Sequence, residues 1–344
     1  MLITRASSIL LGMALLSPIP ALGASGKPAS GSSARGLLLV DNKGDQTLGI
    51  IDPAAGREIA TVRETGFTAH EVAVSPDGKT AYVPIYGNSG VGRPGTDGRT
   101  IDVVDLASRK VVSTINLGRP MRPHCPKFSP ADGLLYISTE LANAVTIIDP
   151  KTNKIVGSIP TSQPESHMLA FSHDGRRIYT ANVGPGTVSV LDVASRKTLA
   201  VIPICKETQR IAVSMDDRWA FTSDQHNPRL AVIDTATNKV ARWVELPGIG
   251  YGTAPTPDGR YLVVAIINKN QVAAVDLKTW KVVHTIEVPA APQEVLIRPD
   301  GGVAFVSCDR SRQIAVINLH NWAVEKKIDA GPVCDGMAWA KIME

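Results

Sequence analysis

The chain has 344 residues, of which 44% are hydrophobic and 20% are charged, and its formal net charge is +4. This composition is ordinary for a globular protein of one large domain or two small ones. The small charge excess does not favour nucleic acid as a partner. Beyond the N-terminal segment no apolar run is long enough for a membrane helix, which excludes a membrane span there.

Residues 1–23 are predicted to form a secretory signal peptide. Arg5 supplies the positive start, and the apolar run Ile9–Leu16 is too short to span a bilayer. Small residues at Ala21–Ala24 provide a cleavage site. We therefore expect a periplasmic or secreted protein in which residues 24–36 form a flexible polar leader.

A repeated pattern fills the rest of the chain. Each copy has four short runs rich in Val, Ile, Ala and Thr, with a turn of the "SPDG" type after the first and a hairpin of the "VIDxxTxK" type after the third. Such runs are typical of strands, and a unit of about 40–45 residues with four strands is a propeller blade. The hairpin residue recurs at spacings of 53, 44, 43, 42, 42 and 42, at Asp52, Asp105, Asp149, Asp192, Asp234, Asp276 and Asn318.

The repeat also predicts how the ring closes. There are seven hairpins, and the segment Cys334–Ile342 aligns with the first strand of the other copies. It is therefore expected to join the three strands that begin at Leu37, which leaves no free sheet edge. The predicted fold is all-β: a seven-bladed β-propeller of four-stranded antiparallel blades over residues 37–344, closed by N- and C-terminal strands together. We expect a monomer.

Three segments carry a resemblance to a known family. "KTAYVPIYG", "RRIYTANVGPGTVSVLDVASRK" and "LLYISTELANAVTIIDPKTNK" resemble the YVTN family of β-propeller repeats, and the likeness covers nearly the whole mature chain. It implies an exported bacterial propeller. Similar propellers include surface-layer repeats, lactonases, streptogramin lyases, the haem d1 domain of nitrite reductase and the copper domain of nitrous oxide reductase. The last uses more histidines than this chain aligns, and fold alone does not fix function.

One position per repeat begins the innermost strand, at the mouth of the central channel. All seven residues there are polar or amphipathic: His70, His124, His167, Gln209, Tyr251, Gln293 and Asp335. Three imidazoles with an open position suit a divalent transition metal such as Zn, Cu, Fe or Ni. His70, His124 and His167 are therefore candidate metal ligands. The alternatives are another ligand-binding or catalytic role, or hydrogen bonds to loop carbonyls.

Other polar groups are expected around the same mouth. The arginines there could hold a carboxylate or phosphate, or pair with nearby acids such as Glu71 and Glu294. The candidate ligand-binding residues are Tyr86, Arg93, Arg122, Asn182, Gln209, Arg210, Asp224, Tyr251 and Gln293. The candidate general bases are Glu71, Glu140 and Asp335.

An insertion lies in the first hairpin-to-hairpin interval, at Tyr86–Thr100. It contains Gly90-x-Gly92-x-x-Gly95, which formally matches a dinucleotide-binding fingerprint. That motif requires a helix starting at the glycines, whereas here Pro94 and a return strand follow. We reject the nucleotide interpretation and expect a flexible loop over the channel mouth.

Four cysteines occur at positions 125, 205, 308 and 334. An even number in an exported protein favours disulfides. Cys308 ends the second strand of its repeat and Cys334 enters the first strand of the next, so a bridge between them is predicted. Cys125 and Cys205 belong to repeats that lie two apart, too far for a direct bond to be expected.

Three functions remain open from the sequence. The first is a binding or scaffold protein that holds a small molecule, metal or peptide at the channel mouth. The second is a metal-assisted, lactonase-like hydrolase or lyase. The third is a redox accessory protein that handles copper or haem d1. The first is favoured because no complete catalytic set is visible, and whether the protein is an enzyme stays open.

Overall fold

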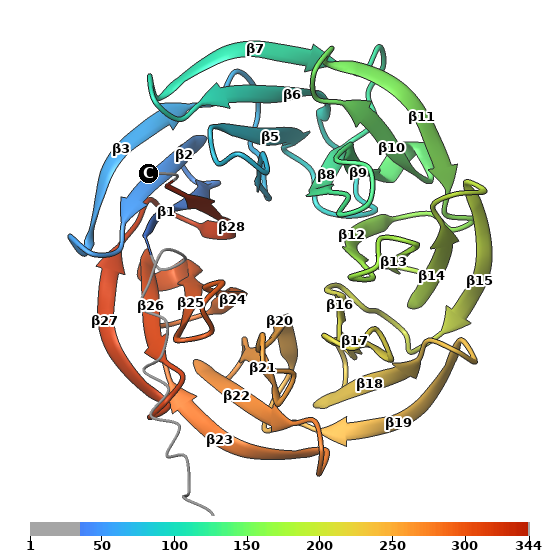
Figure 1. The fold of residues 1–344 in the computed structure, drawn as a ribbon, viewed down its shortest axis with the longest axis vertical. Coiled ribbons are helices and arrows are strands. Elements are labelled where there is room, and N and C mark those ends of the chain that lie inside the picture. The colour runs from blue at the N-terminus through green and yellow to red at the C-terminus, as the bar shows by residue number, and fades with distance from the viewer. Residues whose placement is uncertain (1–34, 343–344) are drawn as a thin grey trace, which may run out of the picture. The chain divides into compact units, whose positions relative to one another are not determined.

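The computed structural model describes residues 35–342, which form seven four-stranded antiparallel sheets arranged around a central axis (Figure 1). The predicted seven-bladed propeller is therefore confirmed. The predicted signal peptide and most of the leader lie outside the described residues. Blade 1 contains β28, β1, β2 and β3, and blades 2–7 take the other strands in chain order, four at a time.

The four strands of each blade occupy successive shells of the ring. The innermost strands are β28 (Cys334–Lys341), β4 (Ala73–Val74), β8 (Pro123–Phe128), β12 (Ser166–Phe171), β16 (Ala212–Val213), β20 (Gly250–Pro255) and β24 (Pro292–Ile297). The second strands are β1 (Gly36–Asn42), β5 (Thr80–Gly87), β9 (Leu135–Thr139), β13 (Arg177–Asn182), β17 (Trp219–Ser223), β21 (Tyr261–Ile266) and β25 (Val303–Cys308).

The third and fourth strands form the outer half of each blade. The third strands are β2 (Thr47–Asp52), β6 (Asp97–Asp105), β10 (Ala144–Asp149), β14 (Thr187–Asp192), β18 (Arg229–Asp234), β22 (Gln271–Asp276) and β26 (Gln313–Asn318). The outermost strands are β3 (Arg57–Arg63), β7 (Lys110–Asn116), β11 (Lys154–Pro160), β15 (Lys197–Pro203), β19 (Lys239–Glu245), β23 (Lys281–Glu287) and β27 (Ala323–Asp329). Single 3₁₀ turns follow β9 (η1, Glu140–Ala142) and β25 (η2, Asp309–Ser311).

The hydrophobic core lies between neighbouring blades. Val263 and Ala265 of blade 6, for example, pack in one cluster with Val306 and Cys308 of blade 7. Both faces of each inner sheet are covered in this way, which explains why second and third strands are near-continuous runs of Val, Ile and Ala. No helix within residues 35–342 has the length and apolar character needed to cross a membrane.

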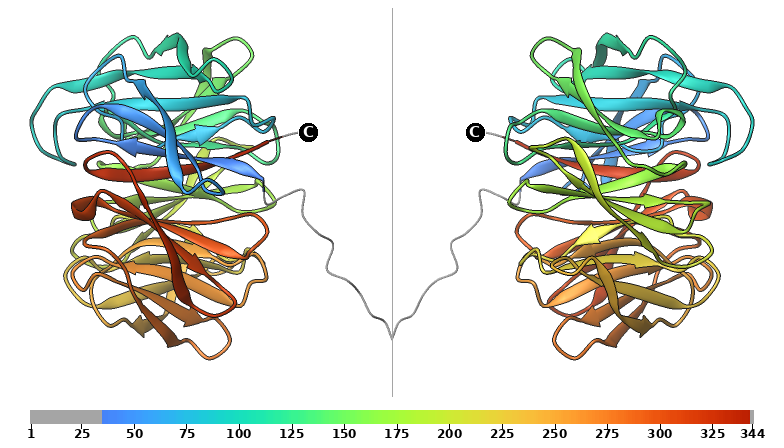
Figure 2. Two further views of the ribbon diagram at one scale, coloured as in Figure 1. Left: turned by 90° about the vertical axis from the view of Figure 1, so that its left-hand side faces the viewer. Right: turned by 90° about the vertical axis from the view of Figure 1, so that its right-hand side faces the viewer.

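Two kinds of turn share one face of the ring, which we call the turn face. In the hairpin after β22, Asp276 Oδ1 accepts the N–H groups of Lys278 and Thr279 at 2.9 and 2.7 Å. In the turn after β4, Gly78 has a φ of +73°, a left-handed conformation that favours glycine. The loops that join blades and those between second and third strands lie on the opposite face, which we call the mouth face. Figure 2 shows strands running between the two faces.

The two ends of the described chain close the ring as predicted. β28 pairs antiparallel with β1, with Trp339 opposite Leu38 and Met337 opposite Val40. Met337 is 2% exposed and belongs to a cluster that also contains Phe305 of blade 7. The last strand therefore completes blade 1 and covers blade 7.

A chain that ends at Val333 lacks β28 and should lose this closure. We expect its free energy of unfolding to fall by at least about 5 kcal/mol, because Met337, Trp339 and the apolar residues that they cover lose their burial. Urea unfolding followed by tryptophan fluorescence measures the effect, with a chain ending at Ile342 as the matched control. Equal urea midpoints for the two chains would contradict the closure.

Candidate functional site

The three histidines meet at the mouth of the channel. His124 Nε2 lies 3.3 Å from His70 Nδ1, and the rings of His124 and His167 face each other with centroids 3.6 Å apart. His124 and His167 are 2% and 5% exposed, whereas His70 is half-buried. The structure thus gathers one imidazole from the beginning of each of blades 2, 3 and 4 into a single cluster, with His70 as its most exposed member.

Irregular strand pairing accompanies the placement of these side chains. The register between β8 and β9 shifts between Pro123 and Pro126, and a similar shift occurs in β12 around His167. A β-bulge re-aims side chains, and prolines favour it because they have no N–H to donate to the ladder. His124 therefore joins the cluster at the mouth, while the adjacent Cys125 is wholly buried in the hydrophobic core.

Burial keeps the three imidazoles neutral. It lowers the pKa of His70 to about 3, with a further contribution from the Lys43 ammonium, and it lowers the pKa values of His124 and His167 well below their usual range. A neutral imidazole has one ring nitrogen that donates and one that accepts. Within residues 35–342, the Nδ1 atoms of His124 and His167 have no hydrogen-bond partner. Such buried atoms are rare, so both nitrogens are candidates for contact with a ligand.

Tyr86 forms an aromatic wall beside the histidines. Its ring centroid lies 4.6 Å from that of His70, 5.4 Å from that of His124 and 6.2 Å from that of His167. Its hydroxyl donates a hydrogen bond to the Glu140 carboxylate, and burial raises the pKa of the phenol, which remains protonated. Tyr86 is thus a fixed part of the cluster and not a mobile loop residue.

The insertion after β5, which the sequence predicts to be a flexible loop over the mouth, is attached to blade 3. Arg122 Nη2 donates to the Arg93 carbonyl oxygen at 2.5 Å, and Arg122 Nε pairs with Asp97 at 2.6 Å. Arg122 Nη1 also pairs with Glu140 at 2.9 Å. Arg122, a candidate for holding an anionic ligand, therefore serves the protein's own acids, while the Arg93 side chain is exposed beside a hollow of about 400 Å³.

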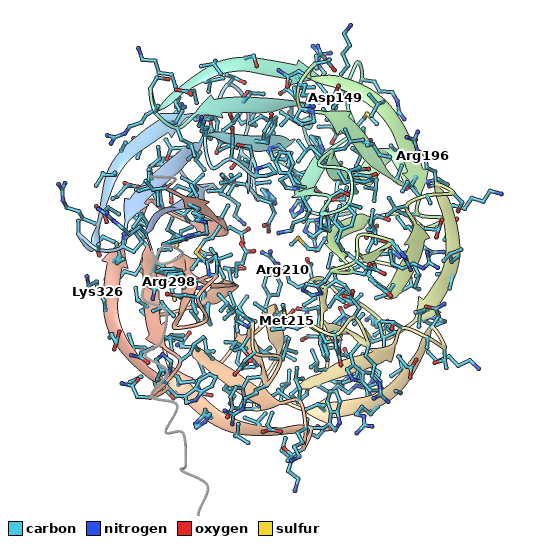
Figure 3. The ribbon with its side chains drawn as sticks, in the orientation of Figure 1. Asp149, Arg196, Arg210, Met215, Arg298 and Lys326 are labelled. Carbon is cyan, nitrogen blue, oxygen red and sulfur yellow. The ribbon has the colours of Figure 1, made fainter. Side chains whose placement is uncertain are left out.

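Arg210 crosses the channel and joins opposite parts of the ring. It extends from the segment before β16 in blade 5, pairing through Nη1 with Glu71 of blade 2 and through Nη2 with Asp335 of blade 1 at 2.8 Å. Asp335 also binds the Lys43 ammonium at 2.8 Å. The side chains of Arg210 and of its two partners, Glu71 and Asp335, are each at most 6% exposed. Figure 3 shows Arg210 near the centre of the ring.

The three candidate general bases are all engaged by other groups. Although burial opposes it, the charges of Lys43 and Arg210 hold the pKa of Asp335 well below its usual range. Burial raises the pKa of Glu71 to about 8 against the Arg210 charge, so Glu71 binds that guanidinium as a neutral carboxyl below this pH and as an ion pair above it. Glu140 accepts hydrogen bonds from Tyr86 and Arg122. None of the three is free to take a proton from water in this arrangement.

Two more of the candidate ligand residues stabilise their own loops. Asn182 bonds to the hydroxyl groups of Thr187 and Ser189, and Asp224 pairs with Arg229 at 3.0 Å. Neither contributes a free polar group to the mouth.

The remaining members of the predicted ring pair with their neighbours. The Tyr251 hydroxyl lies 3.5 Å from Gln209 Oε1, and the Arg210 guanidinium stacks 5.2 Å from the Tyr251 ring centroid. Gln293 donates to Asp309 at 3.3 Å. These contacts place Gln209 and Tyr251 beside Arg210 and tie Gln293 to η2.

The geometry of the cluster does not form a metal centre as it stands. Among residues 35–342, no group of three or more His, Cys, Asp and Glu side chains is arranged to hold a metal ion. The rings of His124 and His167 are tilted by 33° to each other, and the ring of His70 meets that of His124 edge-on at 86°. Metal binding would require at least one ring to turn.

Several further charged groups lie in and near the channel, and of these the sequence predicts only Asp41, at the end of a second strand, to face the mouth. Asp41 is completely buried, both of its carboxylate oxygens lack a partner among the described residues, and burial raises its pKa well above the usual range. Burial likewise raises the pKa of Glu64 to about 7. Lys43 and Lys127 also belong to this group. Lys43 directly follows a strand, and nothing in the sequence indicates that it pairs with Asp335, which lies 292 positions later in the chain.

The expected bridge between Cys308 and Cys334 is not formed. All four cysteines are free thiols. Cys308 Sγ contacts the Val306 carbonyl oxygen at 3.5 Å, and Cys334 Sγ contacts that of Gln313 at 3.8 Å. Burial raises the pKa of both thiols to about 12, which disfavours the thiolate that disulfide exchange requires.

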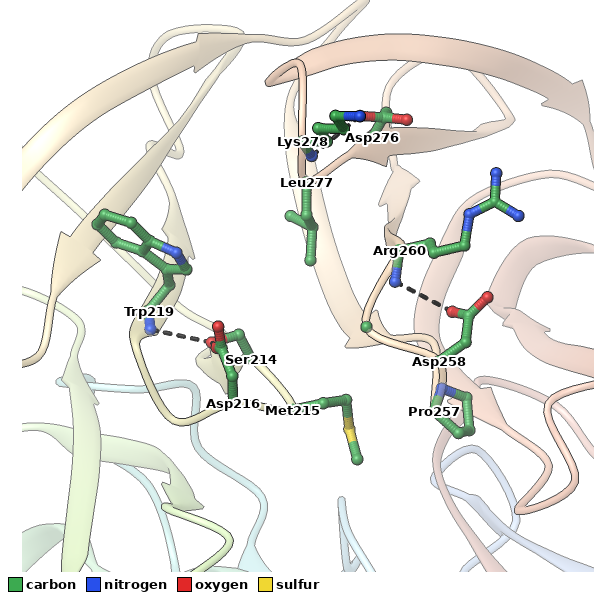
Figure 4. Close-up of a pocket in the computed structure, with 11 residues that line it drawn as sticks. Ser214, Met215, Asp216, Trp219, Pro257, Asp258, Arg260, Asp276, Leu277 and Lys278 are labelled. Atoms are coloured by element: carbon green, nitrogen blue, oxygen red, sulfur yellow. Dashed lines mark hydrogen bonds between the residues drawn. The ribbon is translucent and has the colours of Figure 1, made fainter. Parts of the chain in front are cut away.

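A larger hollow of about 620 Å³ lies away from the channel, on the turn face between blades 5 and 6 (Figure 4). Trp219, Met215 and Leu277 line it together with turn residues. The carboxylates beside it hold the turns, as Asp258 Oδ1 does by accepting the Arg260 N–H at 3.0 Å. Its polar groups are thus largely used by the fold.

Known proteins support the propeller assignment. A model of the cytochrome D1 heme domain family matches residues 129–260. A seven-bladed beta-propeller protein of Mycobacterium tuberculosis is 28% identical over 144 residues, which are 41% of this chain. The match spans only 33% of that relative's length.

Solved structures share the fold over most of the chain. Kuenenia stuttgartiensis hydrazine synthase gives a TM-score of 0.69 at 20% identity, covering 87% of this chain and 99% of that one. The periplasmic gluconolactonase PpgL of Pseudomonas aeruginosa gives 0.71 at 18% identity, covering 90% and 99%. A functionally unknown protein of Desulfotomaculum acetoxidans gives 0.74 at 13% identity, covering 90% and 100%. At these identities the likeness shows the fold alone.

The described channel does not fit a haem. The family model covers the turn after β8 through the turn before β21, but the channel at the centre of the ring is crossed by Arg210 and its two ion pairs. A tetrapyrrole in the channel would have to break both pairs and leave buried charges without partners.

Replacing Arg210 by Met should remove this crossing and leave Glu71 and Asp335 without their guanidinium. At about pH 9, where both Glu71 and Asp335 are ionised, we expect the free energy of unfolding to fall by about 3–5 kcal/mol, as when one partner of a buried ion pair is removed. Adding E71Q to R210M should restore part of the loss. The control is R176M, since Arg176 is 82% exposed and its ion pair should contribute less than about 1 kcal/mol. Equal urea midpoints for R210M and R176M would contradict the crossing.

The raised pKa of Glu71 should make the protein less stable as the pH rises. The neutral carboxyl is favoured in the folded state, so its contribution is complete below the ordinary pKa of 4.5 and is lost as the pH passes through about 8. The E71Q variant should therefore show a shallower decline in unfolding free energy between those pH values. Glu64, whose pKa is also raised, makes the unfolding free energy fall with pH in the same way, and this contribution is present in both the parent and E71Q. Urea unfolding across this range measures both slopes, and equal slopes would exclude the assignment.

Proposed function

We propose that this protein is an exported binding protein that holds a small, uncharged, hydrogen-bonding molecule at the channel mouth. The observation that carries the proposal is the pair of unpartnered Nδ1 atoms on His124 and His167, two buried and neutral imidazoles. A ligand that donates to or accepts from these atoms would satisfy them. The half-buried His70 marks the side from which it would enter.

The charge balance of the mouth supports an uncharged ligand. Lys43, Arg122 and Arg210 each pair with a carboxylate of the protein. An anion would have to compete with those carboxylates, and a cation would lie beside three fixed positive charges. The groups left for recognition are the imidazole nitrogens and the aromatic wall of Tyr86. Both suit a ring bearing hydroxyl groups.

Export rests on the N-terminal sequence. A positive start, a short apolar run and small residues at 21–24 are the features of a signal peptide. The periplasmic location stated for the structurally similar gluconolactonase agrees with this proposal.

A metal-assisted hydrolase is the second candidate. Neutral imidazoles with free nitrogens are the ligands that transition metals bind, and the gluconolactonase shares this fold. In this alternative His124 or His167 turns toward His70, and Glu71, Glu140 or Asp335 must leave its present partner to act as a base. The first candidate leaves these carboxylates with their present partners and requires only that the buried Nδ1 atoms become accessible to the ligand. A haem-dependent function has no support from the described channel.

The lactam of gluconic acid tests the two candidates, because it is an uncharged polyhydroxylated ring that does not hydrolyse as the lactone does. We expect saturable binding by isothermal titration calorimetry that EDTA does not change. The double variant H124F/H167F should bind at least about tenfold more weakly, about 1.4 kcal/mol, because two hydrogen bonds are lost. The control is H320F, on the exposed turn face.

Elemental analysis of protein purified without chelators separates the alternatives. One tightly held zinc or copper ion per chain, lost in H124F/H167F, would replace the binding proposal with the metal enzyme. If the lactam does not bind and no metal is present, both candidates fail.

A further inference from the structure

We propose that the channel contains a second binding site, on the side of Arg210 away from the histidines, for a monocarboxylate with a compact apolar body. A cavity of about 330 Å³ lies there, bounded by the innermost strands β8, β12, β16, β20 and β24 and their flanking residues. These strands surround the centre of the ring in Figure 1. Arg210 and Met168 form one end, and His173, in a turn of the turn face, forms the other.

The wall of this cavity is largely apolar. Phe171, Pro255 and Ile297 line it and are only half-buried, although each lies in an innermost strand. Apolar side chains that face a channel gain free energy when a ligand removes them from water, about 25 cal/mol for each Å² covered. A volume of this size accommodates a small ligand and no folded partner.

Lys127 places one positive charge in this wall. It lines the cavity from β8 and takes part in none of the ion pairs made by residues 35–342. Although burial opposes it, the neighbouring Cys125, Glu294 and Glu71 raise the pKa of its ammonium, which is therefore protonated at neutral pH. Glu294 also lines the cavity and attracts this ammonium, but the two form no ion pair in the described residues. The Glu294 carboxylate accepts the Met337 N–H, and Glu71 binds Arg210.

The repeat shows that the lysine is an exception. Three residues after each ring position, the other six blades have Ala73, Ala170, Ala212, Ala254, Leu296 and Ala338. Packing at this position thus calls for a small or aliphatic side chain, and a lysine there places a charge without a structural requirement for it. The Lys127 side chain is half-buried and forms no ion pair among residues 35–342, so a bound counter-ion would gain free energy by pairing with it.

A carboxylate with an aliphatic body satisfies both features. Its charge would pair with the Lys127 ammonium, and its chain would cover the half-buried apolar residues. A primary amine of the same length would be repelled by the same ammonium. An alcohol would leave the ammonium without a counter-ion. The expected order of affinity is therefore carboxylate, then alcohol, then amine.

Hexanoate, 1-hexanol and hexylammonium are matched probes for this order. Ligand-observed NMR with the full chain should show saturable hexanoate binding and weaker binding of the other two. K127A should weaken hexanoate binding at least about tenfold, about 1.4 kcal/mol. This variant should fold, because alanine occupies the same position in five other blades. K110Q is the control, since Lys110 is exposed on β7.

The two sets of variants distinguish the hexanoate site from the lactam site at the channel mouth. H124F/H167F should leave hexanoate binding unchanged, and K127A should leave lactam binding unchanged. The proposal is overturned if hexylammonium binds at least as tightly as hexanoate in the unaltered chain. It is also overturned if K127A binds hexanoate as well as the parent, or if no saturable hexanoate binding occurs up to about 10 mM.

Discussion

The ion pairs of Arg210 with Glu71 and Asp335 join blade 5 to blades 2 and 1 across the centre of the ring. Most contacts in a propeller hold each blade to its neighbours, whereas these pairs hold opposite parts of the ring together. Because all three side chains are buried, the charges are strongly coupled and each depends on the others. Lys43 extends the network at Asp335, and the Arg210 guanidinium also stacks on Tyr251.

This crossing determines what the channel can hold. On the mouth side lie three neutral imidazoles and a tyrosine, which the proposed ligand would contact. On the turn side lies a largely apolar cavity whose wall also carries Lys127 and Glu294. A tetrapyrrole in the channel would have to break both ion pairs, although residues 129–260 match the model of a haem domain family. A shared fold does not by itself determine the ligand.

The repeat in the sequence was sufficient for the architecture, because blade length, turn residues and hairpin acids all recur at a nearly constant spacing. The same register also named the residues that lie together at the mouth, including His70, His124 and His167. It left open whether Arg210 would bind a ligand or pair with acids, since side-chain direction across a channel does not follow from spacing. Lys43 and Glu64 lie in loops outside the repeated positions, so no sequence pattern indicates that they lie beside the site.

An electron-density map of the protein, crystallised as purified without chelators, tests the central claim most directly. That claim is that Arg210 divides the channel and that the two imidazole nitrogens above it serve a ligand. The account predicts intact pairs from Arg210 to Glu71 and Asp335, with density for a bound molecule against Nδ1 of His124 and His167. A channel that Arg210 does not cross, or Nδ1 atoms bonded to groups of the protein itself, would contradict it.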